Sequence, residues 1–587
     1  MPIRYYSTNR NLKNVAGITP FTGKVSFKEA LLKGQASDEG LFMPDTIPQL
    51  SLKDIQKLKG KPYSDTALLV AQAFLADEFP LEILKKVVKD SYNYPVPLEK
   101  VKSKTFVMRL DQGPTASFKD FAARMMARLM SNCRPKGERL NILVATSGDT
   151  GSAVGEAFKG VAGIDVTILY PETEVSNRQK KQLDTIGGNV QALNIAGKFD
   201  DCQNLVKQAF SDSDLVKCNL TSANSINFGR ILPQIIYYIY AYAQLAEQDE
   251  QAIFSVPSGN FGDALGCEYA RRMGLPVAKL VMPTNENDEF PIFMATGIYK
   301  KNSPSRACIS NAMNVGHPSN LARFFDLYGG TVDRVGQVHK YPDLEEMRQH
   351  IFSVSITDEL TRETIKSVYK RYHVVLEQHG AVGWAGLEEY FQTVSNSKLA
   401  ICLETAHPAK FPEEIQKLLG LTMPLPESMK NIDQREGNAV SITNDYSDFK
   451  KYLQKNLKSK ELARQGDNTT LEGIVLAGDT SAEGWLKTLL QEELPAQTYG
   501  RLLLVPGAKA PVAVQSRGKP VCTCFNVTDT AISAELARCH GTDDDRLAQL
   551  QGQLRCGTNC GSCLPELKRM VRATGPLATP ATAQATI

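Results

Sequence analysis

The stretch "DQGPTASFKD", residues 111–120, places one lysine between an aromatic residue and an acid, directly behind a Gly-Pro turn, a threonine and a serine. A lysine at the start of a helix is most often a solvated side chain. Lys119 can be a chemically used amine only if the fold brings other reactive or anion-binding groups close to it. Its interpretation therefore depends on the loops that follow it in the chain.

Short apolar runs alternate with amphipathic helices from about residue 105 onwards. The runs "NILVAT" (141–146), "DVTILY" (165–170), "GNVQALNI" (188–195) and "AIFSVPSG" (252–259) each lead into a polar or glycine-containing turn. This alternation predicts an α/β fold with a mostly parallel sheet and helical crossovers. Ligands bind at the carboxyl ends of the strands in such sheets, so the loops there are the first places to look for chemistry.

Two of these strands end in Ser-Gly loops that precede helices. They are "LVATSGDTGSA" (143–153) and "FSVPSGNFGDA" (254–264). Backbone N–H groups in such loops can hold a phosphate or a carboxylate. Neither loop has the sequence of a P-loop or of a GxGxxG loop, so each alone is as consistent with a tight turn as with an anion site. Together with an amine they supply what pyridoxal phosphate requires: a lysine for the aldehyde, one loop for the phosphate and one for the substrate carboxylate.

The longer stretch "GPTASFKDFAAR" (113–124) resembles the lysine signature of the threonine synthase family, which are pyridoxal-phosphate enzymes of fold type II, related in fold to the tryptophan synthase β subunit. Further matching stretches occur in order: "STNRNLKNVAGITPFTGKVSFKEALLKG" with "DEGLFMPD", "TSGDTGSA", "NSINFGRILPQ", "PSGNFGD" and "ETAHPAKFPE". The resemblance covers about residues 3–457. It implies a helical N-terminal domain over residues 1–100 and a catalytic α/β region over 101–457.

The resemblance also implies roles for individual residues. Lys119 would bind the cofactor's aldehyde and act as the catalytic acid and base, and Thr405 would face the pyridine nitrogen. The cofactor phosphate would lie in a cradle formed by Ser258, Gly259, Asn260, Phe261 and Gly262. The substrate carboxylate would be held by Ser147, Gly148, Asp149 and Thr150. Candidates for the substrate's own phosphate are Asn227, Arg230 and Lys410, for which a structural role near a domain interface is an equal alternative. His407 is interpreted as an orienting or packed side chain rather than an acid or base.

The reaction that the family carries out converts O-phospho-L-homoserine and water into L-threonine and phosphate by γ-elimination and β-hydration. One amine would move several protons, which works best if burial and the cationic cofactor lower its pKa to roughly 7–8. Two other interpretations stay open. The chain could be another fold type II lyase, such as threonine dehydratase or a phosphoserine-using enzyme, or a redox or interaction protein whose pyridoxal-phosphate region is inactive.

The composition is that of an ordinary globular protein. The chain has 587 residues, 42% of them hydrophobic and 22% charged, with a formal net charge of +3. This length predicts two to four domains, and the charge balance predicts small-molecule partners rather than nucleic acid. No apolar run of an export signal follows the first residues, and the best candidate for a membrane span, residues 231–246, is interrupted by Pro233 and Gln234. We expect a buried helix there and a cytoplasmic protein without membrane contact.

The twelve cysteines fall into two groups. Those scattered along the catalytic region are expected to be buried reduced thiols: Cys133, Cys202, Cys218, Cys267, Cys308 and Cys402. The others lie between residues 522 and 563, where Cys522-x-Cys524 and Cys560-x-x-Cys563 form two close pairs. Four thiolates in this arrangement suit a structural zinc or an iron–sulfur cluster, and the spacing alone leaves both open.

The CxC and CxxC pairs, together with the helix-like stretch "DTAISAELARC" (529–539), resemble the bacterioferritin-associated ferredoxin family, a small helical module that holds a 2Fe-2S cluster. The resemblance implies Cys522, Cys524, Cys560 and Cys563 as ligands, Cys556 as an extra thiol and Cys539 as a packed side chain. A disulfide framework is a rival interpretation. With the preceding residues, the module resembles the C-terminal end of bacterial assimilatory nitrate reductase.

These resemblances divide the end of the chain into a linker with a short α/β segment (458–519), a 2Fe-2S domain (520–575) and a disordered tail (576–587). The cluster module implies an electron-transfer partner. It has no role in phosphohomoserine chemistry, so it is interpreted as a fusion, natural or from a joined gene model.

Overall fold

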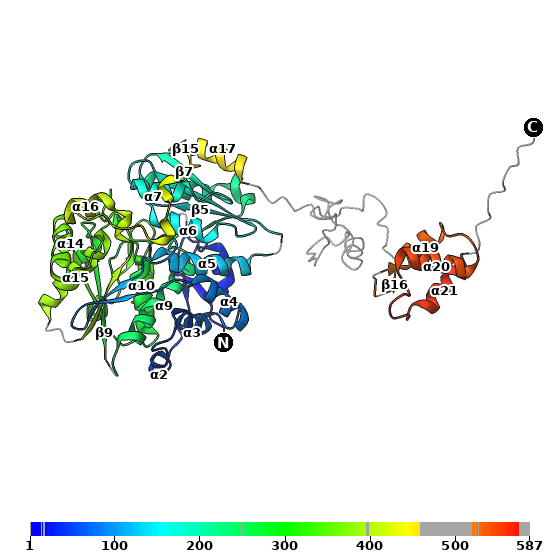
Figure 1. The fold of residues 1–587 in the computed structure, drawn as a ribbon, viewed down its shortest axis with the longest axis horizontal. Coiled ribbons are helices and arrows are strands. Elements are labelled where there is room, and N and C mark those ends of the chain that lie inside the picture. The colour runs from blue at the N-terminus through cyan, green and yellow to red at the C-terminus, as the bar shows by residue number, and fades with distance from the viewer. Residues whose placement is uncertain are drawn as a thin grey trace, which may run out of the picture. The chain divides into compact units, whose positions relative to one another are not determined.

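The computed structural model describes residues 2–457, except 13, 14, 16, 17, 136, 249 and 395–397, and residues 519–574, except 523 and 526. The chain divides into two compact units, Met1–Leu462 and Ala463–Ile587. Each unit is described by itself (Figure 1). The α/β segment and linker expected before residue 519, and the tail expected from 576, lie outside the described residues.

Four helices and a small hairpin form the N-terminal layer of the first unit. The helices are α1 (Phe27–Lys33), α2 (Leu52–Gln56), α3 (Tyr63–Leu75) and α4 (Leu81–Ser91), and the hairpin pairs β1 (Tyr5–Ser7) with β2 (Phe42–Pro44). Prolines precede α3 and α4. The first N–H groups of a helix have no acceptor within the helix, so proline, which has no N–H, is tolerated at its start. The expected helical layer is confirmed.

A six-stranded sheet runs through the first unit in the order β13-β10-β9-β14-β4-β3. Its strands are β3 (Leu98–Lys102), β4 (Thr105–Arg109), β9 (Ala252–Ser255), β10 (Val277–Thr284), β13 (Ile351–Ser355) and β14 (Leu399–Glu404). All neighbours are parallel except the antiparallel pair β3–β4.

A second, five-stranded sheet is parallel throughout, in the order β15-β7-β6-β5-β8. Its strands are β5 (Leu140–Ala145), β6 (Ile164–Pro171), β7 (Val190–Ala196), β8 (Leu220–Ser222) and β15 (Val440–Thr443). The four strands predicted from the sequence are all present. The single sheet expected from them is wrong, because three of the strands belong to this sheet and β9 belongs to the other.

Helix α9 (Phe228–Leu245) connects β8 of the five-stranded sheet to β9 of the six-stranded sheet. Nearly all of its residues are buried, and Pro233 lies inside it. The expected buried helix is therefore confirmed. In the described part of the chain, no helix is long and apolar enough to cross a membrane.

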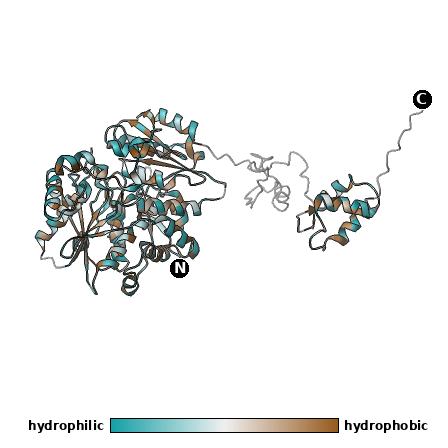
Figure 2. Ribbon diagram, in the orientation of Figure 1, coloured by the Kyte–Doolittle hydropathy of each residue, from teal (hydrophilic) through white to brown (hydrophobic). Residues whose placement is uncertain are grey.

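Further helices cover the two sheets. They are α5 (Lys119–Cys133), α6 (Asp149–Phe158), α7 (Asn177–Asp184), α8 (Phe199–Ser211), α10 (Gly262–Arg272), α11 (Glu289–Thr296), α12 (Leu321–Leu327), α13 (Leu344–His350), α14 (Asp358–Tyr372), α15 (Gln378–Thr393), α16 (Pro412–Leu419) and α17 (Tyr446–Asn456). Helix α17 covers one face of the five-stranded sheet together with α8, because its Phe449 and Leu453 pack into the same apolar cluster as Leu205 of α8. In Figure 2 the strands are mostly brown and the outer helices largely teal, as expected for sheets buried between helices.

The second unit is small and helical within its described residues. A short antiparallel pair, β16 (Pro520–Cys522) and β17 (Val527–Thr528), precedes α19 (Asp529–Leu536), α20 (Asp543–Leu554) and α21 (Leu564–Ala573). Ile532, Leu536, Leu550 and Leu567 are fully buried and form its core. The predicted small helical domain with a helix between the cysteine pairs is confirmed.

The scattered cysteines are mostly where the sequence predicts them. Cys133 is half-buried and the other members of that group are buried, all as free thiols.

Candidate active site and cluster site

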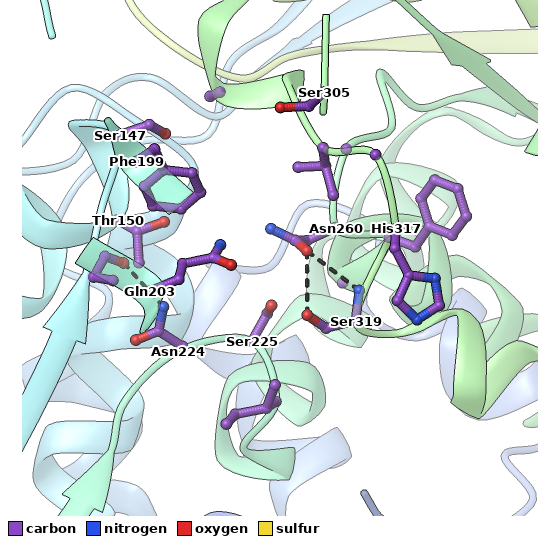
Figure 3. A pocket seen from close by; sticks show the side chains of 18 of the residues that line it. Ser147, Thr150, Phe199, Gln203, Asn224, Ser225, Asn260, Ser305, His317 and Ser319 are labelled. Atoms are coloured by element: carbon purple, nitrogen blue, oxygen red, sulfur yellow. Dashed lines mark hydrogen bonds between the residues drawn. The ribbon is translucent and has the colours of Figure 1, made fainter. Parts of the chain in front are cut away.

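One cavity of about 550 Å³ lies between the two sheets of the first unit. Loops that follow β5, β9 and β14 line it, together with the start of α5. Figure 3 shows polar side chains from both sheets around it, with Ser147 and Thr150 on one side and Asn260 and Ser319 on the other. Its size is that of a small-molecule site. Carboxyl ends of parallel strands thus meet at this cavity, as the sequence predicts.

Lys119 is the first residue of α5 and lines the cavity. Its Nζ lies 4.2 Å from the centre of the Phe118 ring. No hydrogen bond or ion pair to this amine is found among the described residues. The pKa of Lys119 is lowered to about 8, mainly by burial. The Asp263 carboxylate opposes this lowering, and the Arg230 guanidinium contributes to it. The amine is therefore poised near neutral pH before any cofactor contributes, in the direction that the sequence predicts.

The loop before Lys119 is fixed by the chain that leaves β14. The N–H of Phe118 donates to the carbonyl of Thr405 at 2.8 Å, and the N–H of His407 donates to the carbonyl of Ala116 at 3.0 Å. Ala116 has a φ of 54°, a left-handed conformation that these contacts hold in place. The carboxylate of Asp120 accepts from both the N–H and the hydroxyl of Thr115 at 2.8 Å. Lys119 thus leaves a rigid loop in a defined direction.

The loop at residues 258–262 offers backbone rather than side-chain donors. Phe261 has a φ of 63° at the N-terminus of α10, and its ring packs 4.9 Å from that of Phe290. Within the described residues, the N–H groups of residues 259–262 have no acceptor. Such free amides at a helix start form an anion site. The hydroxyl of Ser258 is occupied, because it donates to the carbonyl of Val256 at 2.7 Å, and Ser258 does not line the cavity.

Thr405 and Asn260 both line the cavity, but the side-chain oxygen of Asn260 already has protein partners. Thr405 lines the cavity beside Lys119, as expected. The side chain of Asn260 also lines it, but its Oδ1 accepts from the N–H and hydroxyl of Ser319 at 3.3 and 3.4 Å (Figure 3).

The other Ser-Gly loop is held open by Thr146, whose Oγ1 accepts from the N–H groups of Gly148 and Gly151 at 3.0 and 2.8 Å. Gly148 has a φ of 128°, and a Cβ there would lie 2.6 Å from Nε2 of Gln179, so only glycine fits. Gly148 does not line the cavity, whereas Ser147 and Thr150 do. The loop therefore presents the two hydroxyl side chains and the start of α6 to a ligand.

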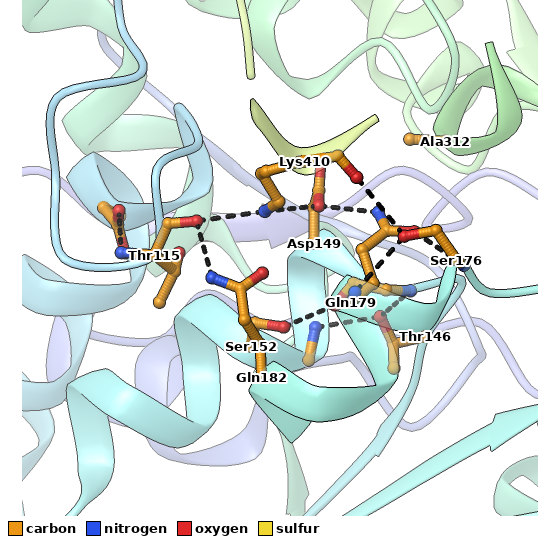
Figure 4. A network of polar contacts seen from close by, with 12 residues as sticks. Thr115, Thr146, Asp149, Ser152, Ser176, Gln179, Gln182, Ala312 and Lys410 are labelled. Carbon is orange, nitrogen blue, oxygen red and sulfur yellow. Dashed lines mark hydrogen bonds and ion pairs between the residues drawn. The ribbon is translucent and has the colours of Figure 1, made fainter. Parts of the chain in front are cut away.

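Lys410 takes a different position from the one expected from the sequence. It is fully buried, does not line the cavity, and its Nζ lies 2.7 Å from Oδ1 of Asp149. The same amine donates to the carbonyl of Thr115 at 3.0 Å (Figure 4). Burial alone would raise the pKa of Asp149, but Lys410 and a hydrogen bond from Gln179 hold it below its usual value. In this geometry Lys410 ties the loop before Lys119 to the Ser-Gly loop rather than facing the cavity, where the sequence places a substrate phosphate.

The other two candidates for the substrate phosphate differ in whether they line the cavity: Arg230 does and Asn227 does not. Asn227 is buried, caps α9 through Gly229 and donates to the carbonyl of Leu31 at 2.8 Å, so its side chain is structural. Arg230 lines the cavity, donates from one terminal nitrogen to the carbonyl of Ala223 at 2.9 Å, and its buried Nε has no partner. Burial lowers the pKa of Arg230 to about 10, which still leaves it charged at neutral pH. Arg230 alone of the three remains suited to an anionic ligand.

His407 is a helix cap. Its Nδ1 accepts from the N–H of Ala409 at 3.1 Å, and burial lowers its pKa to about 4. The expected orienting role fits this geometry.

The structure also adds residues to the cavity that the sequence reasoning did not select. Asn224 and Ser225 line it, and both lie inside the quoted stretch "NSINFGRILPQ", so that stretch already contained the signal. Phe199 and Gln203 come from α8, and His317 and His379 come from distant segments. No local pattern marks these four, because only the fold brings them to the cavity.

The four cysteines expected to bind a cluster come together in the second unit. The Sγ atoms of Cys524 and Cys560 are 3.2 Å apart, and the thiols of Cys522 and Cys563 are hydrogen-bonded. Each pair thus takes one cysteine from each motif. In the described part of the chain, no group of three or more His, Cys, Asp or Glu side chains converges on a single ion. Two separate thiol pairs fit a cluster of two irons, each with two cysteines.

The remaining two cysteines of this unit are buried. Cys539 is packed, as expected, but it follows the end of α19 rather than lying inside the helix, and its thiol donates to the carbonyl of Glu535 at 3.3 Å. Cys556 belongs to the core.

A partnerless lysine of lowered pKa, free amides for a phosphate and a hydroxyl-lined loop fit pyridoxal phosphate. Residues 93–405 match the family described as pyridoxal-phosphate dependent enzymes, and the chain is an enzyme of this class. Two further matches in the first unit define the family more narrowly. Residues 4–92 match the N terminus of threonine synthase, and residues 380–453 match its C-terminal part. The chain belongs to the threonine synthase family.

Individual relatives agree with this assignment. The threonine synthase of Haemophilus influenzae is 38% identical over 434 residues, which are 74% of this chain and 97% of that protein. A crystal structure of the pyridoxal-phosphate-bound threonine synthase from Brucella melitensis is 33% identical, with a TM-score of 0.70 over 78% of this chain and 100% of that one. The Escherichia coli enzyme gives 34% identity and a TM-score of 0.68 over 77% and 99%.

The second unit has its own match. Residues 520–573 match a BFD-like [2Fe-2S] binding domain. The predicted combination of a threonine synthase with an appended 2Fe-2S module is therefore confirmed, and its cofactors are pyridoxal phosphate and a 2Fe-2S cluster.

Proposed function

We propose that this chain is a lyase that converts O-phospho-L-homoserine and water into L-threonine and phosphate. The observation that carries the proposal is the arrangement around Lys119: its partnerless amine shares one cavity with free backbone amides and with Arg230, which forms no ion pair within the described residues. A doubly charged substrate phosphate needs a cation that no protein carboxylate neutralises. Arg230 meets that need.

Pyridoxal phosphate, when bound, supplies the electron sink for bonds next to the substrate's amino group. The proposal assigns its phosphate to the backbone N–H groups of residues 259–262 and its ring nitrogen to Thr405. Ser147 and Thr150 receive the substrate carboxylate. Asn224 and Ser225, beside Arg230, receive the substrate phosphate.

Lys119 carries the protons in this proposal. Its amine must accept a proton from the substrate carbon, return protons elsewhere and do so repeatedly, which requires a pKa close to the working pH. A pKa of about 8 leaves roughly a tenth of the amine neutral at pH 7, whereas an ordinary lysine would leave about 0.04% of it neutral. Burial of Lys119 is thus part of catalysis, not only of packing.

The proposal extends to the organisation of the chain. Residues 1–100 form the N-terminal domain, 101–457 the catalytic region, 458–519 the connector and 520–575 the cluster domain. Buried free thiols such as Cys202 and Cys402 are of the kind that a reducing cytoplasm maintains, so we place the reaction there. The cluster, with Cys522, Cys524, Cys560 and Cys563 as ligands, would exchange electrons with a separate partner.

The decisive experiment measures products from two substrates. Purified protein with pyridoxal phosphate should release phosphate and form L-threonine from O-phospho-L-homoserine. The rival, a threonine dehydratase, would release ammonia from L-threonine and leave phosphohomoserine untouched. Activity only on threonine would overturn the proposal, and binding of the cofactor with no turnover of either substrate would favour an inactive region.

A further inference from the structure

A short turn joins the two Ser-Gly loops of the cavity. It is the 3-10 turn η2 (Asn311–Met313), which lies between them in space although it follows both in sequence. Asn311 donates to Oε1 of Gln179 at 3.4 Å, and Gln179 in turn donates to Asp149 at 2.8 Å. On its other side, a Cβ on Gly259 would lie 3.0 Å from Cα of Met313. The turn therefore contacts the residues that support both loops.

Ala312, in the middle of this turn, is held by a histidine. Its N–H donates to Nε2 of His379 at 3.1 Å, and both residues line the cavity. His379 is 3% exposed and belongs to the first turn of α15. Figure 4 shows Ala312 beside the network that joins Lys410, Asp149 and Gln179. The histidine thus adds a second contact to the turn, through its backbone, beside the contact of Asn311 with Gln179.

The tautomer of His379 follows from its two neighbours. Because Nε2 accepts a hydrogen bond from the N–H of Ala312, Nε2 carries no proton. The ring proton therefore lies on Nδ1. Nδ1 is 2.6 Å from Oε2 of Glu377, a fully buried carboxylate. Glu377 also accepts from the N–H groups of His379 and Gly380 at 2.9 and 3.0 Å, which fixes the carboxylate itself. Glu377 therefore sets the tautomer that lets His379 accept from Ala312.

We propose that His379 is a positioning residue of the active site: held by Glu377, it fixes the η2 turn through Ala312 and so keeps the cofactor-phosphate loop and the Ser-Gly loop of Asp149 in register. The inference rests on the proposed function for its assignment of the two loops. It assigns no proton transfer to the histidine. Its prediction concerns how tightly the cofactor is held and how fast the bound substrate reacts.

The test compares His379→Leu with His379→Gln. Leucine fills a similar volume but cannot accept a hydrogen bond, so the buried N–H of Ala312 loses its partner. Glutamine can present its Oε1 close to the position of Nε2. We expect His379→Leu to raise the dissociation constant of pyridoxal phosphate by about 5- to 20-fold and to lower kcat, since an unpaired buried N–H is costly. His379→Gln should restore both to within about threefold of the native protein.

Two further variants separate positioning from general loss of structure. Both carboxylate oxygens of Glu377 accept hydrogen bonds, and in Glu377→Gln the amide –NH₂ group replaces one of these acceptors. The variant no longer holds the ring proton of His379 on Nδ1 as firmly, so it should reproduce the His379→Leu loss of cofactor affinity. His339→Leu is the matched control, because His339 also pairs with a carboxylate, Asp333, at 2.8 Å but does not line the cavity. It should leave cofactor affinity unchanged. Thermal unfolding of all four variants shows which of them are folded at the assay temperature.

The outcomes are distinct. An unchanged dissociation constant in His379→Leu, or an equal loss in the leucine and glutamine variants, would overturn the inference, since packing alone would then explain the site. The cofactor measurement uses no substrate. If the native protein binds pyridoxal phosphate but forms no threonine, the proposed function fails while the comparison of the His379 variants still decides the positioning role.

Discussion

Nζ of Lys410 lies 2.7 Å from Oδ1 of Asp149, and this ion pair is buried, with the two residues 0% and 5% exposed. It joins three segments that are far apart in sequence, because Lys410 also donates to the carbonyl of Thr115, just before Lys119. The pair therefore fixes the loop that carries Lys119 relative to the loop that precedes α6. A buried pair of this kind is costly to break from one side, since the remaining charge has no water to replace its partner.

Replacing Lys410 with methionine should destabilise the first unit by about 3–5 kcal/mol, because Asp149 is left charged and unpaired in the interior. Urea unfolding followed by the fluorescence of the catalytic unit measures the change. The double variant Lys410→Met with Asp149→Asn should recover more than half of the loss. A loss below 1 kcal/mol in the single variant would mean that the pair contributes little.

The pKa of Lys119 makes a direct prediction for cofactor binding. Only the neutral amine attacks the aldehyde of pyridoxal phosphate, so the rate of covalent rebinding to cofactor-free protein should rise with pH and level off above about pH 9, with a midpoint near the pKa of about 8. Stopped-flow absorbance between pH 6 and 10 measures it. A rate that still rises steeply at pH 10 would show an ordinary lysine. Lys119→Ala should bind the cofactor only non-covalently and lose nearly all turnover.

Arg230 should matter for the phosphorylated substrate and not for the cofactor. Arg230→Gln removes a charged donor, which is expected to lower kcat/KM for O-phospho-L-homoserine by roughly 10- to 100-fold, mostly through KM. The dissociation constant of pyridoxal phosphate should stay within about twofold.

Arg128→Gln is the control for Arg230, because Arg128 also has a buried Nε without a partner but does not line the cavity. Equal effects of the two substitutions would point to stability rather than substrate contact.

Lys119 and the two Ser-Gly loops could be predicted from the sequence because their signals are local: a turn before a lysine, and strands that end in glycine-containing loops. The roles of Lys410 and Asp149 could not. Lys410 stands in a matching stretch and carries a charge suited to phosphate, and only the fold shows that Asp149 already neutralises it.

The same limit applies to His379 and to the two sheets. His379 has no neighbouring motif, and its contact with Ala312 joins segments that no periodicity relates. Hydrophobic periodicity finds strands but not their neighbours. The strand β9 pairs with β10 and β14, and no local pattern shows that it does not pair with β8, the strand that precedes it in the chain.

The catalytic unit should work without the rest of the chain. A chain that ends at residue 457 keeps α17, whose Phe449 and Leu453 are fully buried, and so retains the core of the five-stranded sheet. We expect it to fold, bind pyridoxal phosphate and form threonine at a rate within about twofold of the full chain. A chain that ends at residue 445 should aggregate or unfold, because the face covered by α17 would be exposed to water.

The cysteine pairs allow the two units to be tested for coupling in the full chain. Replacing Cys560 and Cys563 with serine removes one thiol from each of the pairs that the structure brings together, so neither iron would keep both of its cysteines. Iron and acid-labile sulfide should therefore fall to background. Threonine formation should stay within about twofold, which is the outcome expected for two sites that do not couple. A tenfold loss of kcat, roughly 1.4 kcal/mol of barrier, would mean that the cluster acts on the active site, and the module would then be a redox control of threonine synthesis rather than an independent electron carrier.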